Sequence, residues 1–378
     1  MLERMQVLIC GGTGCLSSKS KDIKQQFETV LQSMNLKEEV GLVMTGCFGL
    51  CEKGPVVVVY PDETFYSHVQ VSDVEEICKE HLYKGRPVER LIVRDPIDKQ
   101  RVKNLSELKF YSKQRRIALR NCGNINPMDI NEYIAKDGYM ALGKVLTTMT
   151  PKETVDEMKK SGLRGRGGGG FPTGLKWEFA AASVDTQKYV VCNADEGDPG
   201  AFMDRSILEG DPHTVIEAMA INGFCTGASN GLVYIRAEYP LAIERLNKAI
   251  DQAREFGLLG QHIFGTDFSF DITLRYGAGA FVCGEETALI HSMEGGRGEP
   301  TMKPPFPSVK GYLGKPTNVN NVETFASIPV IINKGWEWYS SIGTEKSKGT
   351  KVFALAGKVN NVGLIEVPMG ITLREVIF

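Results

Sequence analysis

Two patterns of apolar spacing alternate along the chain and predict two domains. In the first 85 residues, short apolar runs predict strands at 7–9, 40–44, 56–60 and 64–69, and one-sided spacing predicts helices over 23–34 and from Ser72. This βαββα order describes one small domain. Further along, the same criteria predict strands at 188–192, 232–236 and 270–275, and helices at 130–137, 139–148, 151–161, 175–182, 212–220 and 241–255. Such alternation predicts a larger domain of the α/β class.

A polar, basic segment separates the two patterns. It begins where Gly85, Arg86 and Pro87 interrupt the first pattern, and it has few apolar faces as far as Arg120. We therefore expect a first domain over 1–85, a linker over 86–124 and the larger domain over 125–340. Strand-like residues at 352–357 and 364–367 belong to a third region, 341–378. With 378 residues, the chain is long enough for each domain to have its own core.

Four of the nine cysteines form a cluster in the first domain. Cys10 and Cys15 follow one predicted strand, Cys47 and Cys51 follow another, and glycines lie beside both pairs. Thiolates are soft ligands, so four cysteines without a nearby histidine suit an iron–sulfur cluster or zinc. Four free structural thiols are the third alternative. Cys78 lies on an amphipathic helix and is expected in the core.

The stretch from Leu163 to Trp177 is the most unusual in the chain. Five of the six residues from Gly165 to Gly170 are glycine, and basic side chains are interleaved with them. Bare backbone in this setting favours close approach of amide groups to an anionic or flat ligand. A flexible glycine linker is the alternative. The match to G-x-G-x-x-G is weak evidence for a dinucleotide fold, because a predicted helix and not a strand precedes it.

Later loops offer further ligand contacts. Three carboxylates, Asp195, Glu196 and Asp198, follow the predicted strand 188–192, where they can accept hydrogen bonds from ribose hydroxyls and would repel a 2′-phosphate. The alternative is a solvated acidic turn. Two more carboxylates, Glu285 and Glu286, precede a helical segment. A proline-rich loop offers an aromatic face at 303–307, and the amide-rich segment 316–324 can bind phosphate or ring edges.

The net charge and the distribution of apolar residues limit the classes of protein to which this chain can belong. The formal net charge is −2, so no overall field favours nucleic acid or an anionic membrane. No apolar run approaches the roughly 20 residues of a spanning helix. The first residues lack the apolar region of a signal peptide. These features predict a cytoplasmic protein without a membrane span.

Two parts of the chain resemble known families. Residues 1 to about 85 are similar to thioredoxin-like [2Fe–2S] ferredoxins, through C-x4-C and C-x3-C motifs on either side of a βαβ-like unit. Residues from about 110 to 378 resemble the flavin-carrying, NADH-binding subunit of respiratory complex I and the diaphorase subunits of NAD-linked hydrogenases and formate dehydrogenases. The segments that carry this resemblance are GRGGGGFPTGLKW, NADEGDPGAF, GEETAL, KPPFP and VNNVET. The implied fold is a ferredoxin domain, a Rossmann-like α/β domain for FMN and NADH, and the start of a β-grasp domain.

The resemblance also implies site residues. The cluster ligands would be Cys10, Cys15, Cys47 and Cys51. The positions that match the family's FMN site are Gly165, Arg166, Gly167, Gly168, Lys176, Asn193, Asp195, Gly284, Glu285, Asn320, Asn321 and Thr324. Those that match its NADH pocket are Phe171, Lys176, Phe179, Glu196, Asp198, Glu286 and Phe306. Among these, Glu286 and Asp198 are the catalytic candidates, although Asp198 stands where complex I members often carry the longer Glu.

The implied function is electron transfer between NAD(H), FMN and iron–sulfur clusters. In this scheme NADH gives hydride to FMN, and the reduced flavin passes electrons singly to the clusters. Fusion to a ferredoxin domain favours a subunit of a soluble, NAD-linked hydrogenase, with electron bifurcation left open. Its implied partners are a hydrogenase-type catalytic subunit, a small ferredoxin-like subunit and soluble ferredoxin.

Several alternatives stay open. They are a subunit of complex I, a subunit of a formate dehydrogenase, a site specific for NADPH, and a non-catalytic wiring or assembly subunit. The family's C-x-x-C-x-x-C site for a [4Fe–4S] cluster has no counterpart before Phe378. We therefore expect the chain to end within the β-grasp domain.

Overall fold

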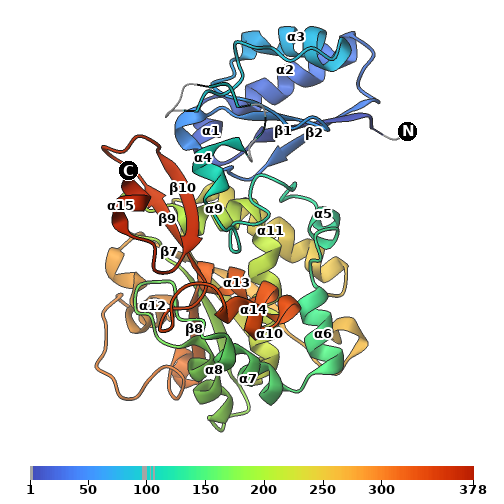
Figure 1. The fold of residues 1–378 in the computed structure, drawn as a ribbon. Helices are drawn as coiled ribbons and strands as arrows, with labels where there is room; N and C mark the ends of the chain where they lie inside the picture. Colours follow the sequence, from blue (N-terminus) through green and yellow to red (C-terminus); the bar gives the residue numbers. More distant parts are fainter. Residues whose placement is uncertain (1–2, 96–99, 103, 105–106) are drawn as a thin grey trace.

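A computed structural model describes residues 3–95, 100–102, 104 and 107–378, so part of the predicted linker lies outside the described residues. The N-terminal domain lies above a larger central domain, and a C-terminal hairpin lies beside both (Figure 1). None of the helices in the described ranges is long and apolar enough to cross a membrane.

The N-terminal domain has the predicted βαββα order. A mixed four-stranded sheet with strand order β2-β1-β3-β4 pairs β1 parallel to β2 and antiparallel to β3. Its core includes Phe27, Tyr66 and Cys78. The helix predicted from Ser72 begins differently, because Ser72 lies inside a short 3₁₀ turn whose capping box is formed by Gln70 and Asp73. The elements are β1 (Met5–Cys10), α1 (Thr13–Ser17), α2 (Ser20–Ser33), β2 (Val40–Thr45), β3 (Val57–Tyr60), β4 (Thr64–Tyr66), α3 (Val74–Glu76) and a π-helical turn (Ile77–Tyr83).

The central domain is built on a parallel sheet with strand order β7-β6-β5-β8. Its strands are β5 (Tyr189–Ala194), β6 (Asn230–Arg236), β7 (Asp271–Gly277) and β8 (Thr317–Asn321). The helices are α5 (Ile130–Ile134), α6 (Met140–Thr148), α7 (Pro151–Ser161), α8 (Thr173–Ala182), α9 (Met203–Gly210), α10 (Pro212–Thr226), α11 (Pro240–Glu255), α12 (Glu286–Met293), α13 (Val322–Lys334) and α14 (Trp336–Ser340). A short helix, α4 (Lys109–Ser112), precedes them.

Alternate residues of β5 face opposite sides of this sheet. Val190 and Cys192 belong to the large core that contains α10, α11 and α13, whereas Val191 packs in a smaller cluster with α12. Helix α10 is almost completely buried, which explains its lack of a polar face. The predicted α/β class is therefore confirmed, with helices on both faces of a parallel sheet.

Strand β8 and helices α9 and α13 were not predicted from the sequence. The segment that forms β8 is polar in composition because it contains several amides, but Asn318 is fully buried and Asn320 is nearly so. Asn318 Nδ2 donates to Asn222 Oδ1 (3.2 Å) and Asn320 Nδ2 donates to Asn318 Oδ1 (3.3 Å). Because these amides bond one another inside the protein, the strand lacks the apolar pattern by which strands are usually found.

The helix before the glycine-rich stretch begins and ends as predicted. Thr150 Oγ1 accepts a hydrogen bond from Glu153 N (3.2 Å), and Thr150 N donates to Glu153 Oε2 (2.8 Å). At the other end, Gly162 adopts a left-handed conformation with φ 69°. Helix α7 therefore delivers the chain directly into the glycine segment.

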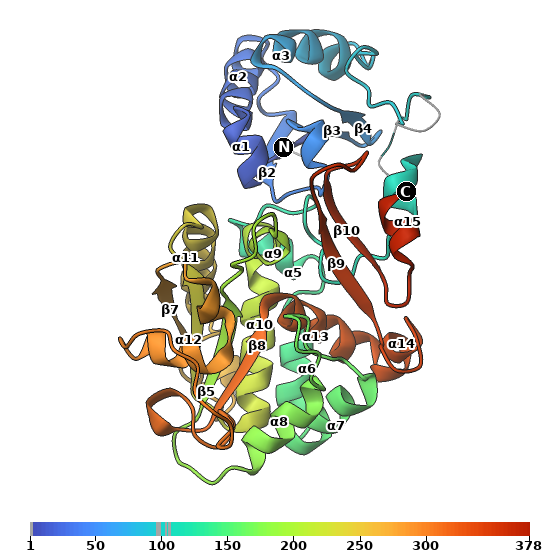
Figure 2. The same cartoon turned by 90° about the vertical axis from the view of Figure 1, so that its left-hand side faces the viewer.

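The C-terminal region forms an antiparallel hairpin of β9 (Thr350–Leu355) and β10 (Gly363–Pro368), followed by α15 (Leu373–Ile377). Figure 2 shows the hairpin reaching from the central domain to the N-terminal domain. Glu366 in β10 is fully buried, and its carboxylate accepts hydrogen bonds from the backbone N–H groups of Ile117, Ala118 and Leu119 at 2.8–3.0 Å. The hairpin thus fixes the chain that connects the two domains.

We predict that Glu366→Ala lowers the stability of the whole chain by about 3 kcal/mol or more, because each buried donor left without a partner costs about 1–3 kcal/mol. The shift in the midpoint of urea unfolding measures this loss. Glu345→Ala, which truncates an exposed glutamate in the same region, serves as the control and should leave the midpoint unchanged. Equal midpoints for the two variants would contradict the assigned role of Glu366.

Candidate functional site

The main cavity lies at the carboxyl ends of β5 and β8. Strand β5 pairs with β6 on one side and with β8 on the other, so the strand order reverses direction at this point. Crevices at such switch points are the usual ligand sites of open parallel sheets. The cavity has a volume of about 810 Å³, which is large enough for a cofactor and part of a second ligand.

The glycine-rich stretch forms one wall of this cavity, and four of its glycines line it: Gly165, Gly167, Gly169 and Gly170. A Cβ atom added to Gly169 would meet no atom of the protein within 4 Å, whereas one at Gly167 would lie 3.1 Å from Asn321 Cβ. Gly168 has φ 104°, which favours glycine. The backbone is therefore open toward the cavity, as a close-approaching ligand requires.

The cation expected from Arg166 does not line the cavity. Its guanidinium is buried and donates to the carbonyl oxygens of Lys348 (2.6 Å) and Thr350 (2.9 Å), and to Tyr339 Oη (3.1 Å). Its backbone N–H contacts the predicted site, because it donates a hydrogen bond to Oγ1 of Thr324 (2.9 Å), which lines the cavity. Arg166 therefore anchors the C-terminal region to the glycine segment.

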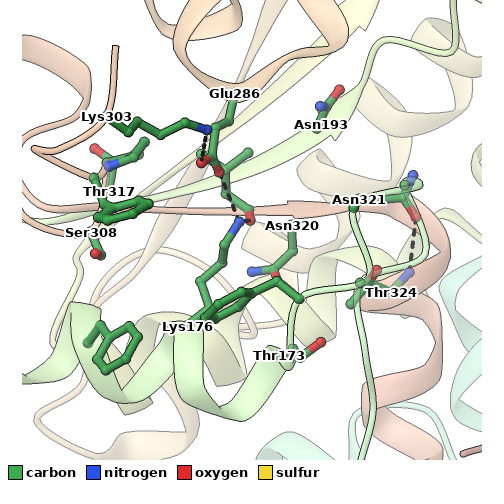
Figure 3. A pocket seen from close by; sticks show the side chains of 18 of the residues that line it. Thr173, Lys176, Asn193, Glu286, Lys303, Ser308, Thr317, Asn320, Asn321 and Thr324 are labelled. Carbon is green, nitrogen blue, oxygen red and sulfur yellow. Dashed lines mark hydrogen bonds and ion pairs between the residues drawn. The ribbon is translucent and has the colours of Figure 1, made fainter. Parts of the chain in front are cut away.

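Two lysines converge on one carboxylate inside the cavity (Figure 3). Lys176 Nζ lies 2.9 Å from Glu286 Oε2, and Lys303 Nζ lies 3.0 Å from both Glu286 Oε1 and Glu285 Oε1. Burial acts to raise the pKa of Glu286, but the two lysines hold that pKa below its ordinary value. The group therefore presents paired charges at the start of α12, where Glu285 accepts hydrogen bonds from Thr287 N and Ala288 N.

Aromatic side chains lie at another part of the cavity wall. The ring centroids of Phe171 and Phe179 are 6.4 Å apart, with an interplanar angle of 47°. Phe306 also lines the cavity. All three rings are about half exposed, with relative accessibilities of 47%, 50% and 56%. Exposed rings beside a cavity offer faces for stacking a planar group.

The three carboxylates of the acidic loop after β5 have different surroundings in the structure. Both carboxylate oxygens of Asp195 are buried without a hydrogen-bond partner, and burial raises its pKa to about 6. Glu196 turns away from the cavity, because its carboxylate accepts hydrogen bonds from Asp204 N (3.0 Å) and Arg205 N (3.1 Å) at the start of α9. Asp198 is exposed and does not line the cavity.

Most of the predicted cofactor residues line the same cavity: Gly165, Gly167, Phe171, Lys176, Phe179, Asn193, Gly284, Glu285, Glu286, Phe306, Asn320, Asn321 and Thr324. The other predicted cofactor residues do not line the cavity: Arg166, Gly168, Asp195, Glu196 and Asp198. The predicted site residues did not include Lys303, although the predicted loop 303–307 begins with it. They also did not include Thr173, Ser308 and Thr317, whose small polar side chains carry no distinctive signal.

The four predicted cluster ligands meet at one end of the N-terminal domain. Cys10, Cys15 and Cys47 are buried, Cys51 is partly exposed, and none forms a disulfide. Cys47 Sγ lies 3.8 Å from Cys51 Sγ and accepts a hydrogen bond from Gly49 N (3.3 Å). The neighbouring thiol of Cys15 raises the pKa of Cys10 well above the ordinary range, and the thiol of Cys10 does the same to the pKa of Cys47.

The four thiols form a chain of neighbours in the order Cys15, Cys10, Cys47 and Cys51. Soft thiolate ligands and nearby backbone N–H groups are what a [2Fe–2S] cluster requires.

The cavity also fits its expected cofactors. The open glycine backbone and the amide side chains of Asn193 and Asn320 offer donors and acceptors for FMN, and the exposed rings suit the adenine of NAD(H). Lys176, Glu286 and Lys303 also line the cavity and offer charged partners for hydroxyl and phosphate groups.

Comparisons with known proteins agree with this picture. A family model described as the Nuo51 FMN-binding domain matches residues 158–330, and one described as the thioredoxin-like [2Fe-2S] ferredoxin matches residues 2–82. The chain is 71% identical over 266 residues to the NADP-reducing hydrogenase subunit HndC of Solidesulfovibrio fructosivorans, a match that covers 70% of this chain and 54% of the relative. It is 52% identical over 249 residues to an NADH-quinone oxidoreductase subunit of Aquifex aeolicus, covering 66% and 58%.

A solved structure, the NAD+-reducing [NiFe]-hydrogenase in its air-oxidized state, matches with a TM-score of 0.60 and 26% identity over the whole of this chain and 61% of that one. The chain thus spans little more than half the length of the curated relatives it matches. The predicted flavin and ferredoxin domains are confirmed, and FMN and a [2Fe–2S] cluster are the cofactors that the two family descriptions name. The chain therefore contains a Nuo51-type FMN-binding domain at residues 158–330 and a thioredoxin-like [2Fe-2S] ferredoxin domain at residues 2–82.

Proposed function

We propose that this chain is the flavoprotein part of a multi-subunit oxidoreductase that passes electrons between NAD(H) and iron–sulfur centres. The observation that carries the proposal is one cavity that joins an open glycine wall, a lysine–carboxylate group and exposed aromatic rings. In the same chain, four cysteines lie on the domain that packs against this one. Together these features supply a flavin site, a nucleotide site and an exit for single electrons.

In this proposal the residues of the cavity bind and orient. When bound, FMN supplies the ability to accept a hydride and to release electrons one at a time. The glycine wall carries it, Asn193, Asn320 and Asn321 offer amide contacts, and Phe171, Phe179 and Phe306 hold the adenine end of the nucleotide. Fixed geometry is the protein's main contribution to the reaction, and proximity alone can lower a barrier by roughly 7–11 kcal/mol in the best cases.

Of the carboxylates, Glu286 has the better support as a contact to the nucleotide. It lines the cavity and is held by two lysines, whereas Asp198 is exposed and does not line the cavity. We retain Asp198 as a second candidate that would need the loop 195–200 to close on the bound nucleotide. Glu196 is better explained as a cap for α9, and Arg166 as an anchor for the C-terminal region.

We further propose that the chain acts in a soluble cytoplasmic assembly with a hydrogenase-type catalytic subunit and a small ferredoxin-like subunit. The names of a hydrogenase subunit relative and of an NAD+-reducing hydrogenase structure support this choice. We propose the domain limits 1–85, 125–340 and 341–378, with 86–124 as the connection. The NADH-quinone oxidoreductase relatives support a complex I subunit as the second candidate.

The nucleotide preference has a specific competing hypothesis. The relative with 71% identity is named as NADP-reducing, and Lys303 is a cation that a 2′-phosphate could approach. In this chain, however, Lys303 is already paired with Glu285 and Glu286. We therefore propose NAD(H), because the two carboxylates would repel an added phosphate.

We predict that the anaerobically purified chain, reconstituted with FMN and iron–sulfur, is bleached faster by NADH than by NADPH. Glu286→Gln should lower this preference by about tenfold, since like charges about 8 Å apart at an effective dielectric of 20 repel by roughly 2 kcal/mol before screening. Stopped-flow absorbance with each nucleotide measures both values. Equal rates in the unaltered chain would contradict the preference for NAD(H), and a chain that retains no FMN would favour the non-catalytic wiring or assembly role.

We predict that Gly169→Ala weakens FMN binding by about tenfold, which corresponds to about 1.4 kcal/mol, while leaving the fold intact. The added methyl group meets no protein atom within 4 Å, so only a ligand on the glycine wall would collide with it. Fluorescence titration of the deflavinated protein with FMN gives the affinity, and thermal melting checks the fold. Gly143→Ala, on a helix outside the cavity, is the matched control, and equal FMN affinity in both variants would place the flavin elsewhere.

A further inference from the structure

The four cysteines are enclosed by more than their own domain. Figures 1 and 2 show α9 and α11 of the central domain below the end of the N-terminal domain that carries α1. The backbones meet without side chains between them, because a Cβ atom on Gly46 would lie 2.3 Å from Gly210 Cα. The loop that leads to Cys47 therefore rests directly on the end of α9.

A carboxylate from α9 holds the first cysteine loop. Glu209 has a relative accessibility of 1%, and its carboxylate accepts hydrogen bonds from Thr13 N (3.1 Å) and Thr13 Oγ1 (2.5 Å). Thr13 lies between Cys10 and Cys15. A buried carboxylate from another domain is thus bonded directly to a loop that carries two of the four thiols.

A guanidinium from α11 holds the same loop from a second position. Arg245 has a relative accessibility of 4%, and its Nη2 donates to the carbonyl oxygen of Gly11 at 2.8 Å. Its Nη1 donates to the backbone carbonyl of Glu209. Gly11 follows Cys10 directly in the sequence, so the guanidinium is bonded to the residue next to the first of the four cysteines.

A second arginine lies beside this group. Arg205 Nε is 3.8 Å from Glu209 Oε1. Among the described residues of the central domain, Glu209, Arg205 and Arg245 thus form one charged group beside the first cysteine loop, with Glu209 in the middle.

We propose that Glu209 and Arg245 are positioning residues of the cluster, which set its reduction potential in opposite directions from the neighbouring domain. The inference rests on the proposed function, because it requires the four cysteines to hold a [2Fe–2S] cluster. One-electron reduction of such a cluster adds one negative charge and breaks no bond. A buried carboxylate nearby disfavours that charge and a buried guanidinium favours it, with little screening by solvent. Hydrogen bonds and charges around a cluster are established means of tuning its potential.

The proposal gives expected shifts of opposite sign. Glu209→Gln keeps an oxygen that can accept from Thr13 N but removes the charge, so the midpoint potential should rise. Arg245→Gln removes the positive charge and should lower it. A tenfold change in the reduction equilibrium corresponds to about 59 mV for one electron, and we expect a shift of this order in each variant. Arg245→Lys keeps the charge and should stay near the unaltered value.

The experiment is an anaerobic redox titration of the whole reconstituted chain, with the reduced [2Fe–2S] signal followed by electron paramagnetic resonance. Reduction by dithionite with mediators makes the readout independent of NADH oxidation. Glu244→Gln is the matched control, since it removes one carboxylate from the exposed face of α11 beside Arg245. Exposed charges are strongly screened, so the control should leave the potential unchanged.

Opposite shifts in Glu209→Gln and Arg245→Gln, with Arg245→Lys and Glu244→Gln near the unaltered chain, support the proposal. If one of these variants assembles no cluster, the direction of the potential shift in the other variant still tests the proposal. The difference in potential between Arg245→Lys and Arg245→Gln tests it as well. Unchanged potentials, or shifts in the same direction, overturn this inference while the proposed function stands. A chain that assembles no cluster overturns the proposed function and this inference together.

Discussion

Buried carboxylates that accept hydrogen bonds from the backbone of distant segments hold this structure together. Glu366 accepts from the connecting segment at 117–119, Glu323 from Val352, and Glu217 from Leu142. Glu196 accepts from the start of α9, and Glu209 from the first cysteine loop. A buried charge is stable only when it is paired or fully hydrogen-bonded, so each of these contacts fixes the position of two segments at once.

The same contacts position the chemistry. Helix α9 begins at a carboxylate of the loop beside the cavity and ends at a carboxylate bonded to the cysteine loop. Close to its start, Asn321 Nδ2 donates to Asp204 Oδ2 (2.6 Å), and Asn321 lines the cavity. One short, buried helix thus connects the wall of the cavity to the loop that carries Cys10 and Cys15, and it fixes the separation between the proposed flavin site and the proposed cluster site.

The structure also depends on a few glycines at which a side chain would not fit or would fill a needed space. At Gly169 the missing Cβ leaves space for a ligand, whereas at Gly46 and Gly210 it allows two domains to touch through their backbones. The sequence shows all of these positions as glycine, but the reasons differ. Only the packing reveals which glycine faces a cavity and which faces another segment of the chain.

The sequence by itself determined the elements and the chemistry of the motifs. Apolar periodicity located most strands and helices, α7 among them, and the cysteine spacing predicted a cluster site. These signals are local, because they depend on residues within a few turns of one another. Most of the predicted cavity residues also came from short motifs whose side chains indeed meet in space.

The tertiary structure alone decided where the charged side chains point. Arg166 and Glu196 belong to the predicted motifs, yet their side chains bond the C-terminal region and α9 instead of the cavity. Conversely, Lys303 enters the cavity, and Glu209 and Arg245 reach the cysteine loop from another domain. The direction of a buried charge depends on which partner satisfies it, and those partners lie far away in the sequence, where no local pattern records them.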